Sequence, residues 1–468
     1  MPADAIWLGL VVVAGLLLAV ALVSRLLQTS PVSDALIALA LGVAVGPLGL
    51  DLLHLGGDTL NHPNIRVVAR LTLAVGVLAI ALRLPLHRMD RHAIRSIAVT
   101  LAVGMPAMWL VTAGIVMLLL GVDPAGALLI SAPLAPTDPV LASGIVSGPL
   151  AQRLIPERIR NLLLAESGVN DGLGLPFVGI ALLLTYPAEG ANLGTWAWHT
   201  LVLSVFGAAI GGSLIGYGSG HLVRLATSRN YVRRPGLLGF SLALTGLVAG
   251  AAAALNLSAI LAAFFAGLGL NWALQEEHQE PQREAQETAS RFLSLPVFLL
   301  LGTALPWDGW FSAGLPLLGA AILILLVRRV PAILAASWAI PSLHGLPDAL
   351  FVGWFGPIGI AALYYGLHEA SLGAGGLVYQ LVTLAIVLSV IVHGLSGPAL
   401  SRWYARATNQ PGSEESADEA EAKVEADESR GKKRENRQAA ETESERQTHA
   451  GHGTKRAPKR STKGRAGS

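Results

Sequence analysis

Two acidic residues, Asp138 and Asp171, lie inside stretches that are otherwise long and apolar enough to cross a membrane. Asp138 belongs to LLISAPLAPTDPVLASGIV, and Asp171 belongs to NLLLAESGVNDGLGLPFVGIALLL. A carboxylate at the centre of a bilayer costs at least about 2.5 kcal/mol, so such residues mark sites that bind an ion or relay a proton. These two carboxyl groups are therefore the first candidates for chemistry in this chain.

The segment APTDPV places a proline on each side of the Thr137-Asp138 pair, namely Pro136 and Pro139. Proline removes a backbone donor and clashes with the preceding turn, so a helix should break here. Inside a membrane, backbone groups freed by a break are tolerated where they line a cavity, and in transporters they serve as ion ligands. The alternative interpretation is a proline kink in which Asp138 caps the restarted helix.

The segment AESGVNDG places four polar side chains on two faces of one helix. Glu166 and Asn170 are four residues apart and share a face, as do Ser167 and Asp171. The carboxylate of Asp171 and the hydroxyl of Ser167 offer hard oxygen ligands. This pair suits an alkali cation that has shed part of its water.

Glu166 lies on the other face and requires a buried cation as its partner. Arg328 and Arg329, in AILILLVRRVPAIL, are the only basic pair deep within a later apolar run. Because an unpaired buried arginine would be very costly, one of them should neutralise Glu166 in a structural ion pair. Alternatively, one arginine lies at the cytoplasmic end of its helix and extends its charge into water.

On this interpretation Asp171 has no basic partner left. An unpaired carboxyl group in a low-dielectric cavity favours its protonated form, since desolvation disfavours the charge. Asp171 is therefore expected to hold a proton near neutral pH and to exchange it for a cation. One site that serves two competing ligands is sufficient for antiport, because the proton leaves only when a cation arrives.

A second helix interruption is predicted in VGWFGPIGIAALYY (352–365), at Gly356 and Pro357. Paired interruptions in two halves of a chain are typical of inverted repeats with crossed broken helices. The alternative is a glycine-rich helix that packs closely against a neighbour. Packing or a dimer contact also accounts for a stripe of small residues at Gly212, Gly216 and Gly220.

The composition indicates that membrane helices position these residues. The chain has 468 residues, of which 53% are hydrophobic and 14% are charged, whereas soluble domains carry about 25% charged residues. Its apolar runs are continuous rather than alternating, which predicts an all-α membrane protein. We expect about thirteen transmembrane helices, which begin near residues 6, 33, 67, 94, 124, 158, 197, 236, 257, 290, 315, 349 and 375.

Arginine is concentrated in alternate loops, near residues 83–95, 150–160 and 221–234. The intervening loops carry acidic residues instead. By the positive-inside rule, this pattern places the N-terminus outside and the C-terminus inside, which agrees with an odd number of spans. The polar stretch 275–291 is expected to be a cytoplasmic connector, either a solvated loop or an amphipathic surface helix.

The chain is predicted to have two parts. Residues 1–405 form the transmembrane domain, and residues 406–468 form a charged cytoplasmic tail that changes from acidic to basic along its length. Such a tail has almost no large apolar residues and cannot bury a core, so it should be disordered. Its basic end, KRAPKRSTKGR (455–465), suits anionic lipid head groups, but an unstructured, expendable tail is the favoured interpretation.

Several classes of function are disfavoured by what the sequence lacks. The chain has no cysteine, which excludes disulfides, thiolate metal sites and redox switches. It has no phosphate-binding glycine loop followed by lysine and serine or threonine, so ATP-driven pumping is unsupported. We therefore expect no cofactor, no enzymatic activity and no nucleic-acid partner. The expected partners are the lipid bilayer, a monovalent cation and a proton.

Four motifs carry a resemblance to a known family: PTDPV, AESGVNDG, AAFFAGLGL (262–270) and GWFGPIGIAALYY, in this order. The chain resembles the bacterial sodium/proton antiporters of the NhaP type, within the cation:proton antiporter superfamily. The resemblance covers about residues 5–405. It implies a homodimer of thirteen-span chains with crossed, unwound helices, located in the bacterial inner (plasma) membrane and contributing to pH homeostasis.

The resemblance also implies roles for individual residues. The ion- and proton-binding set would be Asp171, Asp138, Thr137, Ser167 and Asn170. Of these, Asp171, Ser167 and the backbone of Thr137 would be the cation ligands. Asparagine before Asp171, in place of a second aspartate, resembles the electroneutral branch, which exchanges one cation for one proton. Glu166 would pair with an arginine, best matched by Arg329 and next by Arg328.

Two features depart from the family pattern. Some relatives place an acid on the third span, whereas this span reads LTLAVGVLAIALRLP (71–85) and has none. Another group or water then completes the ion shell, or ion affinity is altered. Ile358 also occupies a position where an arginine is common in relatives.

The leading hypothesis is electroneutral exchange of a monovalent cation for a proton, with Na⁺ as the first candidate for the cation. An intramembrane aspartyl protease also needs two membrane aspartates, but it uses a Gly-x-Gly-Asp arrangement that is absent around Asp171. A passive cation channel is the third class, and two broken helices among thirteen spans favour a carrier over a channel.

Overall fold

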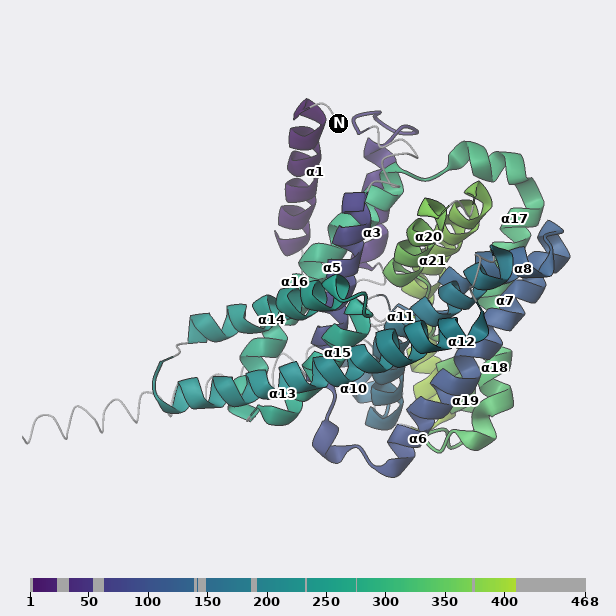
Figure 1. The fold of residues 1–468 in the computed structure, drawn as a ribbon. Helices are drawn as coiled ribbons and strands as arrows, with labels where there is room; N and C mark the ends of the chain where they lie inside the picture. Colours follow the sequence, from purple (N-terminus) through teal and green to yellow (C-terminus); the bar gives the residue numbers. More distant parts are fainter. Residues whose placement is uncertain are drawn as a thin grey trace, which may run out of the picture. The chain divides into compact units, whose positions relative to one another are not determined.

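The computed structural model describes the helical body of the chain and leaves several connecting segments and the C-terminal tail undescribed. The described residues are 3–22, 33–53, 63–138, 141, 149–186, 192–231, 234–274, 276–372 and 375–409. Within these ranges every regular element is a helix, as the sequence predicts (Figure 1). All of these helices belong to one compact unit, Met1–Ser413. The predicted disorder of the tail remains a prediction, because the tail is undescribed beyond residue 409.

The bounds of the α-helices follow from the sequence in chain order. They are α1 (Ala3–Leu22), α3 (Asp34–Val45), α5 (Pro63–Arg83), α6 (Arg91–Val99), α7 (Met105–Leu120), α8 (Pro124–Ser131), α10 (Pro149–Leu154), α11 (Glu157–Thr185), α12 (Leu193–Trp196), α13 (Gly207–Ser228), α14 (Arg234–Ala254), α15 (Ala259–Ala273), α16 (Glu276–Thr303), α17 (Trp307–Val327), α18 (Val330–Ala336), α19 (Leu346–Trp354), α20 (Ile360–Ser371) and α21 (Gly376–Ala407). Short 3-10 or π segments adjoin them: η1 (Leu86–Arg88), η2 (Thr100–Gly104), η3 (Ala132–Leu134), η4 (Ala197–Phe206) and η5 (Ser337–Ala339).

Six helical stretches of the described chain are long and apolar enough to cross a membrane. They are Ile65–Arg83, Arg91–Leu120, Glu157–Thr185, Leu193–Ser228, Trp307–Ala339 and Gly376–Ala407. Shorter apolar helices accompany them, among them Asp34–Val45, Pro124–Leu134 and Ala259–Ala273. The structure therefore supports a membrane protein built of several apolar helices, as expected.

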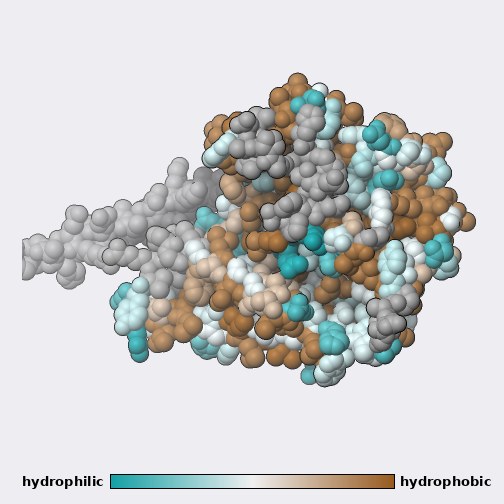
Figure 2. All heavy atoms as spheres, turned by 45° about the horizontal axis from the view of Figure 1, so that its top comes forward, coloured by the Kyte–Doolittle hydropathy of each residue, from teal (hydrophilic) through white to brown (hydrophobic). Residues whose placement is uncertain are grey.

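Large apolar side chains are exposed on the outside of this bundle. Leu118, Phe311, Leu315 and Trp338 are examples from two of these helical stretches. Hydrophobic residues also cover much of the face seen in Figure 2, where hydrophilic residues form smaller groups. Such extensive apolar surface would be unfavourable in water, and it suits contact with lipid.

Glycines allow the helices around the site to approach one another closely. In α13, Gly212 and Gly216 face backbone atoms of Ala262 and Ala266 in α15, and a Cβ atom at either glycine would overlap that backbone. The stripe of small residues is thus a contact inside the chain, which is the packing interpretation of the pattern. Close packing against α13 fixes the position of α15, which in turn packs on α11.

The polar stretch 275–291 is helical in its described part, which decides between its two predicted forms. From residue 276 onward it belongs to α16, and the side chains of Gln282 and Gln286 are buried. Gln282 accepts a hydrogen bond from the backbone N–H of Ser241, and Gln286 donates one to the hydroxyl of Thr245 at 3.0 Å. The solvated-loop alternative was wrong, and the helix alternative holds: one side of the helix is exposed, as at Glu284, and hydrogen bonds to α14 allow the amide side chains on the other side to be buried.

Local signals set both ends of the helix that precedes the first break: a cap and a proline begin it, and later prolines end it. Asp123 caps α8 by accepting hydrogen bonds from the N–H groups of Ala125 and Gly126, both at 3.1 Å, and Pro124 occupies the first turn, where no donor is needed. Pro133 lies in the tighter turn η3, and the helix has ended by Pro136. Pro139 lies outside the described residues, so its predicted part in the break is untested.

The second break separates α19 from α20. Residues 355–359 between them are not helical, as predicted from Gly356 and Pro357. Ile358 within this gap is buried, and its N–H group donates to the hydroxyl of Ser389 on α21 at 2.7 Å. The gap is thus held by a neighbouring helix and is not exposed to lipid.

Candidate functional site

The two helix breaks meet inside the bundle. The backbone N–H of Asp138 donates to the carbonyl of Pro357 at 2.8 Å. In return, the Asp138 carboxylate accepts a hydrogen bond from the N–H of Ile360, the first residue of α20, at 2.6 Å. A carboxylate at the N-terminus of a helix is stabilised by the unpaired N–H groups and the helix dipole there. Asp138 therefore caps α20, a helix distant in sequence, and its other carboxylate oxygen accepts from the N–H of Leu141 at 3.3 Å, as in the alternative interpretation in which it caps its own restarted helix.

A hydrogen-bond network joins the first break to α11. The hydroxyl groups of Thr137 and Ser167 are 3.0 Å apart, and the Asn170 amide donates to the Thr137 hydroxyl at 2.7 Å. Asn170 also accepts from the N–H of Thr137 at 3.2 Å and donates to Glu166 at 2.8 Å. All four side chains are buried. Asn170 thus links the unwound segment to the charged residue one turn earlier on its own helix.

Glu166 and Arg329 form a buried ion pair with two parallel hydrogen bonds. The guanidinium nitrogens of Arg329 lie 3.0 and 2.8 Å from the two carboxylate oxygens of Glu166. Arg329 also donates to the carbonyl of Val352 near the end of α19, at 3.0 Å. Two parallel bonds fix both distance and orientation, so the pair connects α11 to the second broken helix.

Arg328 has a different set of partners. Its guanidinium group is buried, and it donates to the carbonyls of Leu134 and Pro136 at the first break and of Gly356 at the second, the last at 2.7 Å. Neither arginine therefore extends into water. A positive charge is favourable at helix C-termini, where carbonyl groups lack partners. Arg328 thus satisfies the ends of both broken helices with one side chain.

Asp171 differs from every other charged residue of this cluster. Its side chain is buried, and neither carboxylate oxygen has a hydrogen-bond partner in the described part of the chain. Its backbone carbonyl accepts a hydrogen bond from the hydroxyl of Tyr365 at 2.6 Å. The site thus contains one buried acid whose two oxygens are free to bind something that the structure does not include.

Two glycines of the second break make room for the charged groups. A Cβ atom on Gly356 would overlap the Arg329 side chain, and a Cβ atom on Gly359 would overlap the carboxylate of Asp138. The glycine-rich motif is therefore required by close approach of side chains as well as by the break. On α11, Gly174 is needed in the same way, because the ring of Tyr365 packs against it.

We expect Gly359→Ala to destabilise the protein. The added methyl group would displace the Asp138 carboxylate from the N–H of Ile360, and overpacking of this kind costs about 1–3 kcal/mol. The melting temperature of the purified protein should fall accordingly. Gly250→Ala on α14 is the matched control, since no described atom lies within 4 Å of its new Cβ position, and it should leave the melting temperature unchanged or higher. Equal melting temperatures for both variants would contradict the described packing.

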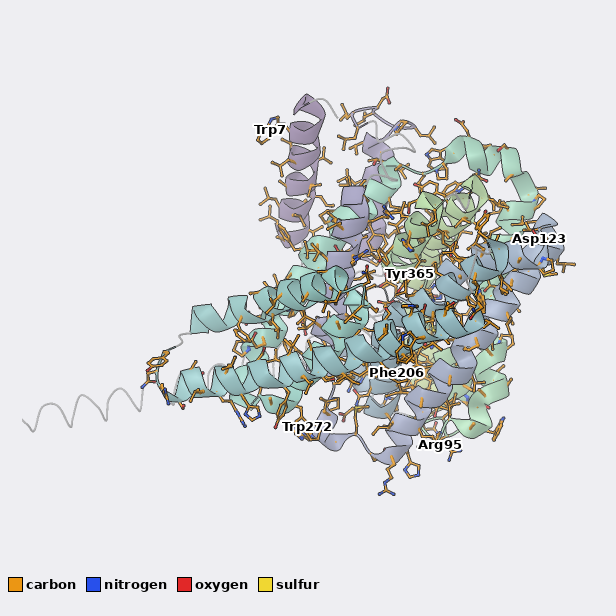
Figure 3. The ribbon with its side chains drawn as sticks, in the orientation of Figure 1. Trp7, Arg95, Asp123, Phe206, Trp272 and Tyr365 are labelled. Carbon is orange, nitrogen blue, oxygen red and sulfur yellow. The ribbon has the colours of Figure 1, made fainter. Side chains whose placement is uncertain are left out.

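Two functional contacts were not assigned from the sequence. Tyr365 lies within a quoted motif, but no spacing indicates that its hydroxyl reaches a carbonyl on another helix. Figure 3 shows Tyr365 in the interior of the bundle, between Trp7 at one end and Arg95 at the other. Arg328 could have been recognised as a helix-end cap, because it is a second arginine beside one that already has an acidic partner.

The oxygen-bearing groups of the first break and of the Asp171 face of α11 suit a monovalent cation that is carried as a substrate. Asp171 supplies a carboxylate, and Ser167 supplies a hydroxyl one turn earlier on the same face. Thr137 supplies a hydroxyl and the backbone of the unwound segment. Among the described residues, no three His, Cys, Asp or Glu side chains are grouped as they would be around a resident metal ion.

Comparison with known proteins gives one family. The family model described as "Sodium/hydrogen exchanger, transmembrane" matches residues 13–403. A Na(+)/H(+) antiporter of Schizosaccharomyces pombe is 32% identical over 402 residues, which is 80% of this chain and 85% of that protein. The Na(+)/H(+) antiporter 2 of Zygosaccharomyces rouxii is 30% identical over 397 residues, which is 78% of this chain and 49% of that protein.

The fold is also found among solved structures. The sodium proton antiporter MjNhaP1 of Methanocaldococcus jannaschii superposes with a TM-score of 0.69 at 18% identity, over 86% of this chain and 99% of that one. The chain spans about half the length of the Zygosaccharomyces relative and most of the Schizosaccharomyces one. These two relatives are fungal, so the comparisons support the family and not the bacterial origin that the motifs suggested. From its motifs, its fold and the family match over most of its length, the chain belongs to the sodium/hydrogen exchanger family.

Proposed function

We propose that this chain exchanges a monovalent cation for a proton across a membrane, and that Asp171 binds the cation and the proton in turn. Na⁺ is the first candidate for the cation. The observation that carries the proposal is a fully buried carboxyl group with two free oxygens beside the meeting point of two helix breaks. A proton and a cation compete for this carboxylate, so one leaves when the other binds. A cation would also use the hydroxyl of Ser167 and oxygen atoms of Thr137.

The charges around the site support exchange of one cation for one proton. The cluster contains three carboxylates, Asp138, Glu166 and Asp171, and two guanidinium groups, Arg328 and Arg329. With all of them ionised, one negative charge remains, and one proton or one Na⁺ on Asp171 neutralises it. Both loaded forms then cross with the same net charge, which makes the cycle electroneutral. Asn170 supports this further because it adds no second negative charge beside Asp171.

In this proposal the roles of the remaining residues follow from their contacts. Glu166 and Arg329 hold α11 to the second broken helix, and Asn170 positions Thr137. Asp138 and Arg328 provide hydrogen-bond partners for the backbone groups at the ends of the broken helices, and they do so while the ion site exchanges a proton for a cation. Each of these residues has a hydrogen-bond partner within the chain, whereas the carboxylate oxygens of Asp171 have none among the described residues.

The membrane arrangement that we propose has thirteen spans, with the N-terminus outside and the tail inside the cell. The alternation of arginine-rich and acidic loops supports this orientation. In the arginine-rich loop before α6, Asp90 caps the helix by accepting from the N–H of Ala93 at 2.8 Å, which holds the pKa of the Asp90 carboxyl below its usual range. We further propose a homodimer in the plasma membrane, by analogy with the family.

The proposal is tested in everted membrane vesicles from cells that lack exchangers of their own. The lumen is first acidified by respiration and followed with a trapped pH dye. Addition of Na⁺ should raise the lumenal pH, and Li⁺ and K⁺ measured in parallel would give the cation preference. If none of the three cations changes the lumenal pH, the proposed function is wrong. Peptide cleavage without cation flux would point to a protease instead.

Electroneutrality is tested separately in liposomes that contain the purified protein. The membrane potential is set with K⁺ gradients and valinomycin, and the initial rate of Na⁺-driven proton movement is measured at each potential. An electroneutral exchanger should show the same rate at every potential. A rate that changes systematically with potential would contradict the one-to-one stoichiometry but not the exchange itself.

A further inference from the structure

A second buried acid, Glu369, is not used by the site described above. It lies on α20 near the end of the helix, and its side chain is 0% exposed. Both of its carboxylate oxygens are without a hydrogen-bond partner in the described part of the chain. Apart from Asp171, no other carboxyl group among the described residues combines full burial with two unpartnered oxygens.

Two arginines of α5 lie near this end of α20, and neither is bonded to Glu369; the buried Nε of Arg66 has no partner among the described residues. Arg66 of α5 donates to the hydroxyl of Ser371 at 2.6 Å, and Arg70 donates to the hydroxyl of Tyr364 at 3.1 Å. His368, the neighbour of Glu369, points about 100° away around the helix. On α21, the other helix against this surface, no Asp, Glu, Lys or Arg occurs before residue 402. A buried carboxylate without a cation is very costly, so Glu369 holds a proton in this environment.

Glu369 is aligned with the ion site along one helix. Tyr365 precedes it by four residues, so the two side chains lie on the same face with Cβ atoms about 5–6 Å apart. The Tyr365 hydroxyl donates to the backbone carbonyl of Asp171 at 2.6 Å, and its ring packs against Gly174 of α11. Glu369 therefore lies one helical turn beyond a residue that touches Asp171.

The direction of this alignment leads from the site to a surface. α20 begins at Ile360, whose N–H is bonded to Asp138 in the centre, and ends at Ser371, which is exposed. Between these ends, Tyr365 contacts α11, and Glu369 is a buried polar side chain one turn farther along the same face of α20. A protonatable group placed here is in position to pass protons between the surface and the site.

We propose that Glu369 is a second proton-binding site, which loads protons for Asp171 from the side of the membrane at which α20 ends. This inference rests on the proposed exchange function. The Glu369 carboxyl group releases its proton toward the Asp171 carboxylate as the cation departs, which leaves Asp171 protonated and Glu369 ionised. Glu369 then takes up a proton from the adjacent solution. Proton number and charge balance, since one proton enters for each one passed on.

The test compares Glu369→Gln, Glu369→Asp and wild type in the vesicle and liposome assays. Glutamine has the shape of the neutral acid but binds no exchangeable proton, so the exchange rate should fall by about 10²-fold, a typical contribution of a proton-transferring group. Aspartate keeps a proton site and should restore a substantial part of the rate. The Na⁺ concentration that half-maximally raises the melting temperature should be the same in all three proteins.

Glu157→Gln is the matched control, because it makes the same chemical change at an exposed position at the start of α11. It should exchange at the wild-type rate. A wild-type rate in Glu369→Gln overturns the inference while the exchange function stands, whereas loss of Na⁺ stabilisation would make Glu369 a cation ligand and also overturn it. If Glu369→Gln does not fold, the exchange rates of Glu369→Asp and Glu369→Ala are compared instead. Equal rates for these two variants would overturn the inference. Absence of exchange in wild type would refute the function and this inference together.

Discussion

Asp171→Asn is expected to abolish exchange while the protein still folds. Asparagine has nearly the same shape as aspartate but carries no negative charge, so neither a proton nor a cation can be held in turn. Cation-triggered alkalinisation in everted vesicles should fall to the level of vesicles without the protein. The amount of folded protein should be unchanged, because neither carboxylate oxygen of Asp171 has a partner to lose among the described residues.

The stability of this variant is a separate part of the prediction. Asp171 is buried without a compensating cation, so the ionised form of its carboxyl group opposes folding and only the loaded form is tolerated. Replacing it with a neutral amide should therefore leave the melting temperature equal to or above that of the wild type at neutral pH. Asp171→Asn that unfolds, or that exchanges Na⁺ at a substantial fraction of the wild-type rate, would contradict the role given to this residue.

Glu166→Gln and Arg329→Ala are expected to have the largest effects on folding. Each removes one partner of a buried ion pair and leaves the other charge unpaired, which costs about 3–5 kcal/mol. Native proteins are stable by only about 5–15 kcal/mol, so either change removes a large part of the total. Both variants should yield much less monodisperse protein in size-exclusion chromatography than wild type does.

A double variant separates an ion-pair effect from general damage to the core. Glu166→Gln combined with Arg329→Met removes both charges, and replacing a whole buried pair is much less harmful than breaking it. The double variant should therefore yield more folded protein than either single variant. If Glu166→Gln alone folds at the wild-type level but is inactive, Glu166 takes part in ion binding and the structural role assigned to the pair is wrong.

The parts of the fold that could be predicted are those that depend on local sequence. Length and apolarity indicate membrane helices, and Pro136, Gly356 and Pro357 indicate the breaks because proline and glycine act on their own backbone. The four-residue spacing on α11 also indicates which polar side chains share a face. An acid at membrane depth then identifies Asp171 before any contact is known.

The parts that could not be predicted depend on contacts between distant segments. Arg328 and Arg329 are adjacent and chemically identical, and only the angle at which their helix crosses α11 decides which one meets Glu166. Asp138 was expected to line a cavity or cap its own helix, and it does accept from the N–H of Leu141, but it also caps α20, more than two hundred residues away, which no local pattern indicates. The burial of Gln282 and Gln286 likewise depends on α14, which supplies the hydrogen bonds.

The most direct test of the central claim is whether Na⁺ displaces a proton from Asp171. Purified protein in a weakly buffered solution is titrated with NaCl, with choline chloride as the control for ionic strength, and the released protons are counted from the change in pH. We predict that wild type releases protons on addition of Na⁺, at most one per chain, and that Asp171→Asn releases none. Equal release from both proteins, or Na⁺ binding by wild type without any release, would contradict competition at this carboxyl group.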